Sequence, residues 1–581
     1  MAKRTGAMHV STIVARRNGK EYVSHLVRRS FREDGKVKHE TLANLSALPD
    51  TAVAAVRASL SGAPMMAADE RLEIVRSRPH GHIAAIWAQA HALGLPGLLG
   101  PAGRERDLAM ALIVARVARP GSKLATTRWW TDTTLAVDLG ITKASTDNVY
   151  AAMDWLADRQ DRIETQLAAR HLNDTVNPNR LALFDLSSSW MTGRCCPLAA
   201  RGYSRDGKKG LPQIEYGLLT DPLGRPVAVK VFPGNTADPT AFTAITEHIK
   251  DTFNLGQMVM VGDRGMITSA RIEALKELGG YGWVTALRAP QIAALAAEDG
   301  PLQMSLFDQT NLAEIAHPDY PGERLIACRN PDLATERARK RLALLAATDT
   351  NLNTIAKAVA AGRLKGAGKI GIKVGKVIGK HKMGKHYTLD ITDTTFTFTH
   401  DRDSINAEAA LDGIYLIRTT VPAATMSADR VVATYKSLAN VERDFRSLKS
   451  IDLDLRPVHH YTETRVRAHV FICMLAAYLV WHLRAAWTPL TFTDENRPQP
   501  ADPVAPAQRS RDADRKAGTK KTRDGLPARS FIGLLEHLGT LTRNTIAITG
   551  TDTEFELLAT PTPEQRQAFE LIAAPIPLHL K

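Results

Sequence analysis

The sequence predicts an α/β fold built on a mixed β-sheet with helices on both faces. Strand-like apolar segments at 181–190, 214–220 and 225–232 are followed by alternating helix-like and strand-like segments. The second and third strand-like segments are joined by the tight-turn sequence DPLG, which favours an antiparallel hairpin. A hairpin followed by alternating helices and strands is typical of a mixed sheet covered by helices. At 581 residues, the chain is long enough for several domains.

Composition and charge indicate a folded protein with an anionic partner. Apolar residues make up 44% of the chain and charged residues 23%, which are ordinary values for a globular protein. The 75 lysines and arginines exceed the 61 acidic residues by 14, which favours nucleic acid or a membrane surface as partner. The longest apolar run, 470–481, is shorter than the about 20 residues of a membrane-spanning helix. We therefore expect nucleic acid and no membrane.

The cysteines and the N-terminus both indicate a cytoplasmic protein. Four cysteines in a chain of this length cannot form a disulfide framework, and no CxxC pair with a nearby histidine offers a zinc site. The first 20 residues contain no apolar run of signal-peptide length, so export is not indicated.

Two predicted domains precede the mixed sheet. Residues 1–65 form a small basic β module, because strand-like segments within 8–46 are separated by the hairpin signals NG and DG. Residues 66–178 are expected to form a helical domain, because apolar residues recur there at helical spacing. We expect this domain to bind DNA, in line with the net positive charge of the chain.

The predicted catalytic core is split by an insertion. Its first part, 179–290, has the element order β-β-β-α-β-α-β, as in a ribonuclease-H-like core. A β-rich insertion with a basic arm is expected at 291–425, and the second part of the core, 426–488, begins with a long amphipathic helix. The remaining segments are a linker rich in Pro, Arg, Lys and Asp at 489–528 and a C-terminal α/β tail at 529–581.

Two aspartates are expected at one edge of this sheet. Asp185 falls on the first core strand and Asp263 follows the fourth, so both side chains can lie at the ends of neighbouring strands. Each taken singly also fits an ordinary turn or cap residue. A third carboxylate nearby favours a shared site over two unrelated turns.

The amphipathic helix at 427–449 supplies that third carboxylate, Glu442. At about 100° per residue, one apolar stripe is formed by Leu438, Val441, Phe445 and Leu448. A second stripe beside it is formed by Tyr435, Glu442, Arg446 and Lys449. The alternative is a solvated face held by pairs such as Glu442 with Arg446, each stabilising the helix by about 0.2–0.5 kcal/mol.

Three clustered acids predict a metal-dependent phosphoryl transfer. Two carboxylates about 4 Å apart repel by about 4 kcal/mol at an effective dielectric of 20, so the cluster needs a cation. Oxygen ligands favour Mg²⁺ or Mn²⁺, and two such ions can activate the attacking hydroxyl and stabilise the leaving oxygen. Tyr435, Arg446 and Lys449 would then bind the DNA phosphates beside the metal ions.

Several segments in order resemble DDE-type bacterial insertion-sequence transposases, in the IS-four-like group with a tyrosine-arginine-glutamate-lysine (YREK) signature. The segments are LFDLSSSW at Asp185, FPGNTAD at 232–238, VGDRGMIT at Asp263, YKSLANVERDFRSLKS at 435–450 and RPVHHYTETRVRAHVFICML at 456–475. The resemblance implies that Asp185, Asp263 and Glu442 are the catalytic, metal-binding triad, with two Mg²⁺ or Mn²⁺ ions as cofactors. One position departs from the signature: Leu438 stands where it has an arginine. Arg446, one turn beyond Glu442, is our candidate to replace that arginine.

The resemblance also implies what the protein acts on. Its expected substrates are double-stranded DNA, namely the terminal inverted repeats of its own element and the target DNA. Expected reactions are cleavage and strand transfer in cut-and-paste transposition, by a homodimer on paired ends, in the cytoplasm of a bacterium at the nucleoid. Relatives of this kind cut through a hairpin intermediate.

Two rival functions remain open at this point. One is a catalytically inactive DNA-binding descendant, and the other is a ribonuclease-H-like nuclease without strand transfer. The basic arm, 357–386, carries nine lysines and arginines and no acid, which fits either a solvated charged face or contacts with DNA phosphates. Its GAGKI sequence lacks the spacing of a phosphate-binding P-loop, so no nucleotide cofactor is expected.

Overall fold

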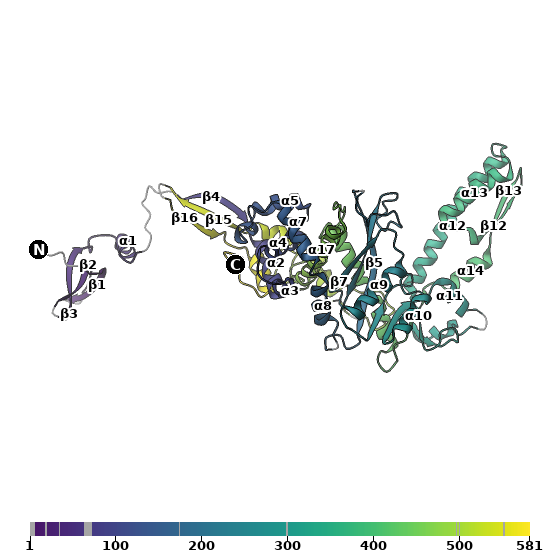
Figure 1. The fold of residues 1–581 in the computed structure, drawn as a ribbon, viewed down its shortest axis with the longest axis horizontal. Coiled ribbons are helices and arrows are strands. Elements are labelled where there is room, and N and C mark those ends of the chain that lie inside the picture. The colour runs from purple at the N-terminus through teal and green to yellow at the C-terminus, as the bar shows by residue number, and fades with distance from the viewer. Residues whose placement is uncertain are drawn as a thin grey trace. The chain divides into compact units, whose positions relative to one another are not determined.

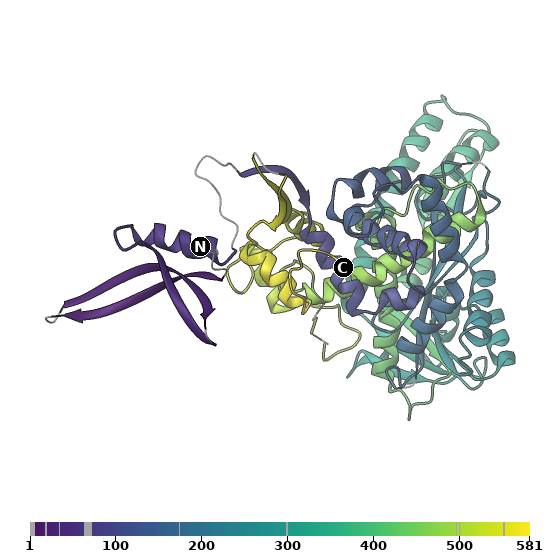
Figure 2. The same ribbon diagram turned by 60° about the vertical axis from the view of Figure 1, so that its left-hand side comes forward.

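The structure is a computed structural model that divides the chain into two compact units. Unit 1 comprises Met1–Ser77 and Asn544–Leu557, and unit 2 comprises Arg78–Arg543 and Leu558–Lys581 (Figures 1 and 2). The residues described are 6–17, 20–33, 35–62, 72–173, 175–193, 195–297, 300–495, 497–498, 500–549 and 552–581.

Unit 1 contains the small β module. Strands β1 (Met8–Arg17), β2 (Lys20–Glu33) and β3 (Lys36–Asn44) form an antiparallel sheet, and helix α1 (Asp50–Leu60) follows. The NG turn expected between the first two strands lies outside the described residues, whereas Gly35 of the DG turn has the positive φ of 74° that glycine favours. A second sheet, β16 (Glu554–Leu558), β15 (Thr542–Ile548) and β4 (Leu72–Pro79), has most of its residues in this unit.

The described residues of the region predicted to be helical form seven helices. α4 packs against both α7 and α17, so this region shares a hydrophobic core with a helix from much later in the chain. The helices are α2 (Gly81–Ala92), α3 (Leu95–Leu99), α4 (Arg104–Ala118), α5 (Lys123–Thr131), α6 (Thr134–Asp138), α7 (Thr146–Ala157) and α8 (Gln160–His171).

An eight-stranded mixed sheet forms the centre of unit 2. Its strand order is β10-β11-β14-β9-β8-β5-β6-β7, in which β8 is parallel to its two neighbours and the other pairings are antiparallel. The first five strands in chain order are β5 (Leu181–Trp190), β6 (Gln213–Thr220), β7 (Pro226–Pro233), β8 (Met258–Val261) and β9 (Tyr281–Ala286). Helices α9 (Asp238–Asp251) and α10 (Ser269–Leu278) complete the expected β-β-β-α-β-α-β order.

Helices cover both faces of this sheet. α17 (Glu463–Ala486) packs on β7, α16 (Leu438–Arg446) and α9 pack on β5, and α10 packs on β9 (Figure 1). α17 is long and apolar enough to cross a membrane, but 83% of its apolar window is buried inside the protein, as in the core helix of a globular domain. The sheet is therefore a buried layer, which explains why β8, with the sequence MVMV between two parallel neighbours, is entirely apolar.

The insertion at 291–425 is less β-rich than expected. Three of its strands, β10 (Leu312–Ile315), β11 (Arg324–Arg329) and β14 (Ile414–Thr419), extend the central sheet. The rest is mainly helical, with α11 (Ala289–Leu295), η1 (Met304–Phe307), α12 (Pro331–Ala360), α13 (Ala367–His381), η2 (Gly384–His386) and α14 (Arg402–Ala410). Strands β12 (Tyr387–Ile391) and β13 (Phe396–His400) form a separate hairpin. The expectation of a β-rich insertion gave too much weight to the threonine-rich strands, which are short, whereas the helices of this segment are long.

The helix predicted at 427–449 is divided into three pieces. α15 (Ala428–Lys436) and α16 are separated at Ser437, and η3, a π-helical turn at Ser447–Ile451, follows α16. Ser437 keeps right-handed helical angles, so the two α-helices run on with only a local break. A π turn widens the spiral and changes which way the residues after it point.

Residues 489–528, expected to be a linker, pack against the core. They contain α18 (Arg511–Thr519), and the buried ammonium of Lys516 donates a hydrogen bond to the carbonyl of Thr488. The C-terminal segment then adds α19 (Phe531–Gly539), β15, β16 and α20 (Pro563–Leu571).

Candidate active site

The three predicted acids line one cavity of about 410 Å³. The cavity lies where the middle of β5 and the end of β8 meet α15, α16 and the start of α12, and we call it the triad cavity. Its lining residues are Asp185, Asp263, Asn330, Leu333, Tyr415, Tyr435, Lys436, Leu438, Ala439 and Glu442. The sequence had predicted that these three acids lie together, although Asp185 and Glu442 are 257 positions apart.

The parallel pairing of β5 and β8 positions the two aspartates. Leu183 pairs with Val261, and each aspartate lies two residues beyond its member of that pair. Gly262 lies between strand and aspartate, where an added Cβ would lie 3.0 Å from Ile267. A larger residue would therefore disturb the approach of Asp263 to the cavity.

Backbone hydrogen bonds hold one oxygen of each aspartate. Asp185 Oδ1 accepts from the amide of Leu186 at 2.8 Å, and Asp263 Oδ1 accepts from the amides of Gly265 and Met266 at 2.9 and 2.8 Å. Within the described part of the chain, no hydrogen bond or ion pair is made by either Oδ2 or by the carboxylate of Glu442. All three acids thus keep oxygens free for a ligand.

The buried stripe of α16 holds Glu442 in place. Val441 and Phe445 are buried, and the ring of Phe445 meets Tyr216 of β6 edge-on at a centroid distance of 5.8 Å. Glu442 lies on the exposed side of the same helix, next to the half-buried Leu438. The amphipathic pattern therefore orients Glu442 as the sequence predicted.

Burial and the neighbouring carboxylates shift the pKa values of two residues that line the triad cavity. The pKa of Asp185 is raised to about 7 by burial, the largest cause, and by the neighbouring Asp263 and Glu442 charges, against the opposing effects of the Leu186 amide and Arg205. Burial, Asp263 and Glu442 also raise the pKa of Tyr435 to about 12. A bound cation would relieve this repulsion, so the donor set fits a hard divalent metal ion.

A second cluster of ligand-type side chains lies elsewhere. In the described ranges, Asp161, Glu164 and His248 form a set whose ligand atoms all lie within 4.8 Å, which is not found for the triad. Glu164 already accepts hydrogen bonds from Gln160, from the Val229 amide at 3.0 Å and from His248. This cluster ties α8 to β7 and α9, and its key carboxylate has no oxygen to spare.

Lys449 is separated from the other predicted site residues. The triad cavity is not lined by Lys449, whose ammonium lies 2.9 Å from Asp206 Oδ1 in a buried ion pair. Asp206 also accepts from Arg456 and from the Trp190 amide. No sign of this role for Asp206 is present in the sequence, because nothing in the loop sequence YSRDGKK distinguishes Asp206 from an ordinary turn residue at the surface.

The two arginines of α16 differ in their partners. Both line a separate cavity of about 260 Å³, so Arg446 is not part of the triad cavity lining. Arg443 donates to Glu495 Oε2 at 3.2 Å, whereas Arg446 is exposed and forms no ion pair or hydrogen bond with any described residue. Arg446 is therefore the arginine with its guanidinium free.

A short segment, 502–505, borders the triad cavity. The sequence had indicated only a linker at these residues. Lys436 Nζ donates to the carbonyls of Pro503 and Ala505, the latter at 2.9 Å. Asn330 Nδ2 donates to the carbonyl of Val504 at 3.1 Å. Two polar residues of the cavity wall are thus held by a segment whose proline-rich composition indicated only a connection.

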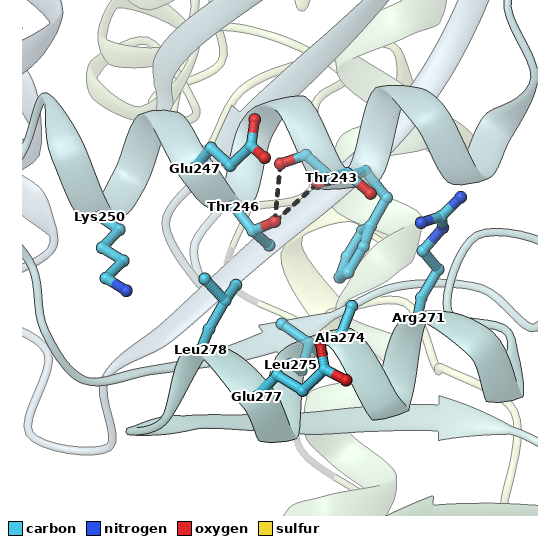
Figure 3. A pocket seen from close by; sticks show the side chains of 10 residues that line it. Thr243, Thr246, Glu247, Lys250, Arg271, Ala274, Leu275, Glu277 and Leu278 are labelled. Atoms are coloured by element: carbon cyan, nitrogen blue, oxygen red, sulfur yellow. Dashed lines mark hydrogen bonds between the residues drawn. The ribbon is translucent and has the colours of Figure 1, made fainter.

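The cavity between α9 and α10 has a different character (Figure 3). It measures about 270 Å³, and the Thr246 hydroxyl at its wall donates back to the carbonyls of its own helix. Glu247, Lys250, Arg271 and Glu277 surround it with charges of both signs. This is a furrow between two amphipathic helices, without the cluster of free carboxylates found at the triad cavity.

Two comparisons with known families identify the chain. The transposase DDE domain matches residues 195–479, and the N-terminal domain of IS1634 family transposases matches residues 11–64. The chain is an insertion-sequence transposase. No curated protein matches the transposase.

The DDE match has two consequences for the site. It includes Asp263 and Glu442, and it begins after Asp185. Because it has a DDE domain, the transposase belongs to a general class of DNA-binding enzymes that cut DNA with the help of divalent metal ions. The N-terminal match names the IS1634 family, so the IS-four-like, YREK-type assignment stays a prediction.

Proposed function

We propose that the transposase binds the terminal inverted repeats of its own element and catalyses their cleavage and strand transfer at the triad cavity. The observation that carries this proposal is the set of three carboxylates with free oxygens around one cavity, beside the middle of β5 and the end of β8. Asp263 follows the carboxyl end of β8, the kind of position at which open α/β sheets bind their ligands. The order β7-β6-β5-β8-β9, with β5 antiparallel to β6 and parallel to β8, supports the ribonuclease-H-like core.

Each residue has a distinct part in the proposed reaction. Asp185, Asp263 and Glu442 would hold Mg²⁺ or Mn²⁺ ions, which supply Lewis-acid activation of the attacking hydroxyl and of the leaving oxygen. Tyr435 lies in the cavity wall, where its hydroxyl can donate to a DNA phosphate. Arg446, with its free guanidinium, would bind a phosphate of the incoming strand bidentately from the neighbouring cavity.

The role predicted for Lys449 is the least supported by the structure. Its ammonium is paired with Asp206, and burial lowers the pKa of Lys449. To bind a phosphate, Lys449 would have to break its ion pair with Asp206. The Asp206 carboxylate would then remain paired with Arg456, which already binds it. We propose that Lys449 acts by positioning the loop of Asp206 beside β5 until DNA arrives.

The setting follows from the same proposal. The substrates are the two element ends and a target duplex, and a homodimer would pair the ends. We place the transposase in the cytoplasm, at the nucleoid. These statements extend the family assignment and the net charge of +14.

The test is DNA cleavage by full-length variants on a duplex that carries the element's terminal repeat. Asp185→Ala, Asp263→Ala and Glu442→Ala should each abolish Mg²⁺-dependent cleavage, because each removes a metal ligand rather than a core contact. The matched control is Glu247→Ala, an exposed acid in the furrow between α9 and α10, which should cut normally.

The outcomes separate the proposal from its rivals. Normal cleavage in any two triad variants would remove the proposed site. Wild-type protein that binds the repeat but never cuts it would indicate an inactive DNA-binding descendant. Cleavage without joining to a target plasmid would indicate a nuclease alone.

A further inference from the structure

Helices α12 and α13 form, with the hairpin β12–β13, a subdomain that projects from the sheet (Figure 1). We call residues 331–400 the projecting subdomain. It has a hydrophobic cluster of its own, which includes Leu352, Ile370, Val374 and Tyr387 and is separate from the main core. A segment that builds its own core does not depend on its surface charges for folding, so those charges are available for another role.

The lysines of α13 form one exposed row. At about 100° per residue, Lys369, Lys373, Lys376 and Lys380 fall within about 60° of one another, and at about 1.5 Å per residue the row is about 16 Å long. All four are exposed, and none forms an ion pair or hydrogen bond with the described residues. The basic arm contains no acid of its own, and although its Lys385 pairs with Glu408, the charge of the lysine row is uncompensated among the described residues.

Glycines form a second row on another side of α13, about 120° around the helix from the lysines, in which Gly371 is half-buried and the other three are exposed. Gly368, Gly371, Gly375 and Gly379 recur at spacings of three and four, and a Cβ added at any of them would meet nothing within 4 Å. Glycine weakens a helix interior relative to alanine. The described part of the chain thus gives no steric reason for glycine at these four positions.

The two rows explain each other if an anionic partner lies along this face. We propose that α13 binds the sugar-phosphate backbone of duplex DNA, with the lysines neutralising phosphates and the glycines allowing the backbone to approach closely. This inference rests on the proposed function, because it takes the DNA of that reaction as the partner. Contacts of this kind carry affinity without reading sequence.

A membrane surface fits this helix less well. A basic amphipathic helix that lies on lipid inserts its apolar face. The apolar face of α13 is already covered, because Ile370 and Val374 are buried in the projecting subdomain. The exposed Ile372, between the two rows, is the one large apolar side chain that α13 leaves open.

The first experiment measures the salt dependence of binding. Full-length protein binds a fluorescent duplex of random sequence, and log K is plotted against log salt concentration. Lys373→Gln with Lys376→Gln should flatten the slope by about 1.8, since each lost phosphate contact removes about 0.9. The matched control is Arg339→Gln with Lys340→Gln, which removes two exposed charges of α12 that are already paired with Glu336.

The second experiment tests the glycine row. Gly371→Ala with Gly375→Ala adds two methyl groups in open space, so the melting temperature should not fall. Duplex affinity at fixed salt should nevertheless drop at least threefold, with the slope unchanged, because the methyl groups hold the duplex away. Gly518→Ala, at an equally open helical glycine of α18, should leave affinity unchanged.

The outcomes distinguish this inference from the proposed function. An unchanged slope in the lysine variant, or unchanged affinity in the glycine variant, overturns the α13 surface while leaving the triad proposal intact. Wild-type protein that binds vesicles of anionic phospholipid in preference to the duplex also overturns it. Wild-type protein that binds no duplex at all overturns both proposals. Single-turnover cleavage by the lysine variant at low salt and saturating protein should remain normal.

Discussion

The triad cavity and the Asp161–Glu164–His248 cluster are both gatherings of metal-ligand side chains, yet they differ in what those side chains already bind. The tighter cluster is the one whose glutamate is saturated, with three hydrogen-bond donors around Glu164. The more open triad keeps free oxygens on all three acids. Free carboxylate oxygens, rather than short distances between ligand atoms, therefore distinguish the proposed site, whereas the oxygens of the buried Glu164 are all used in contacts between elements.

The largest expected effect is on folding, at the saturated cluster. Glu164→Ala should lower the free energy of unfolding by about 3 kcal/mol, because it leaves a buried amide and two side-chain donors without an acceptor. Urea denaturation measures this loss. Asp161→Ala is the control, since Asp161 is exposed and should cost less than about 0.5 kcal/mol. Lost cleavage in Glu164→Ala protein that remains fully folded would mean that this cluster has a catalytic part.

The next effect concerns the two arginines of α16. Arg446→Lys should lower the cleavage rate about tenfold, equivalent to about 1.4 kcal/mol of transition-state stabilisation, because lysine cannot bind a phosphate bidentately. Arg443→Lys should be close to neutral, since Arg443 is paired with Glu495. Single-turnover cleavage of a terminal-repeat duplex compares them. An inactive Arg443→Lys beside a normal Arg446→Lys would show that the paired arginine is the functional one.

The smallest expected effect is on pH dependence. Burial raises the pKa of Glu164 above its ordinary value, so the folded state retains that proton more strongly than the unfolded state does. The contribution of this group to stability is complete below the ordinary glutamate pKa and is lost as pH rises through the raised pKa. Glu164→Gln should lack this loss. The difference in unfolding free energy between wild type and Glu164→Gln, followed by urea denaturation from pH 4 upward, would be constant if the Glu164 pKa were unshifted.

Local sequence patterns determined the core and the acids of the site. The hairpin DPLG, the alternation of helices and strands after it, and the apolar stripe of Val441 and Phe445 depend on residues close together in the chain. Such patterns fix an element and the direction in which its polar face points. Asp185, Asp263 and Glu442 could therefore be assigned to one edge of the sheet before the tertiary structure placed them around one cavity.

Only the tertiary structure decided which charges remain free. The pairing of Lys449 with Asp206 joins residues 243 positions apart, and the hold of residues 503–505 on Lys436 joins others more than 60 apart. Periodicity carries no information about such partners, because they meet through the packing of whole elements. The sequence by itself thus determined where the acids lie and which face Glu442 occupies, whereas packing decided that Arg446 stays open and Lys449 is held, since the partner of a charge depends on what folds against it.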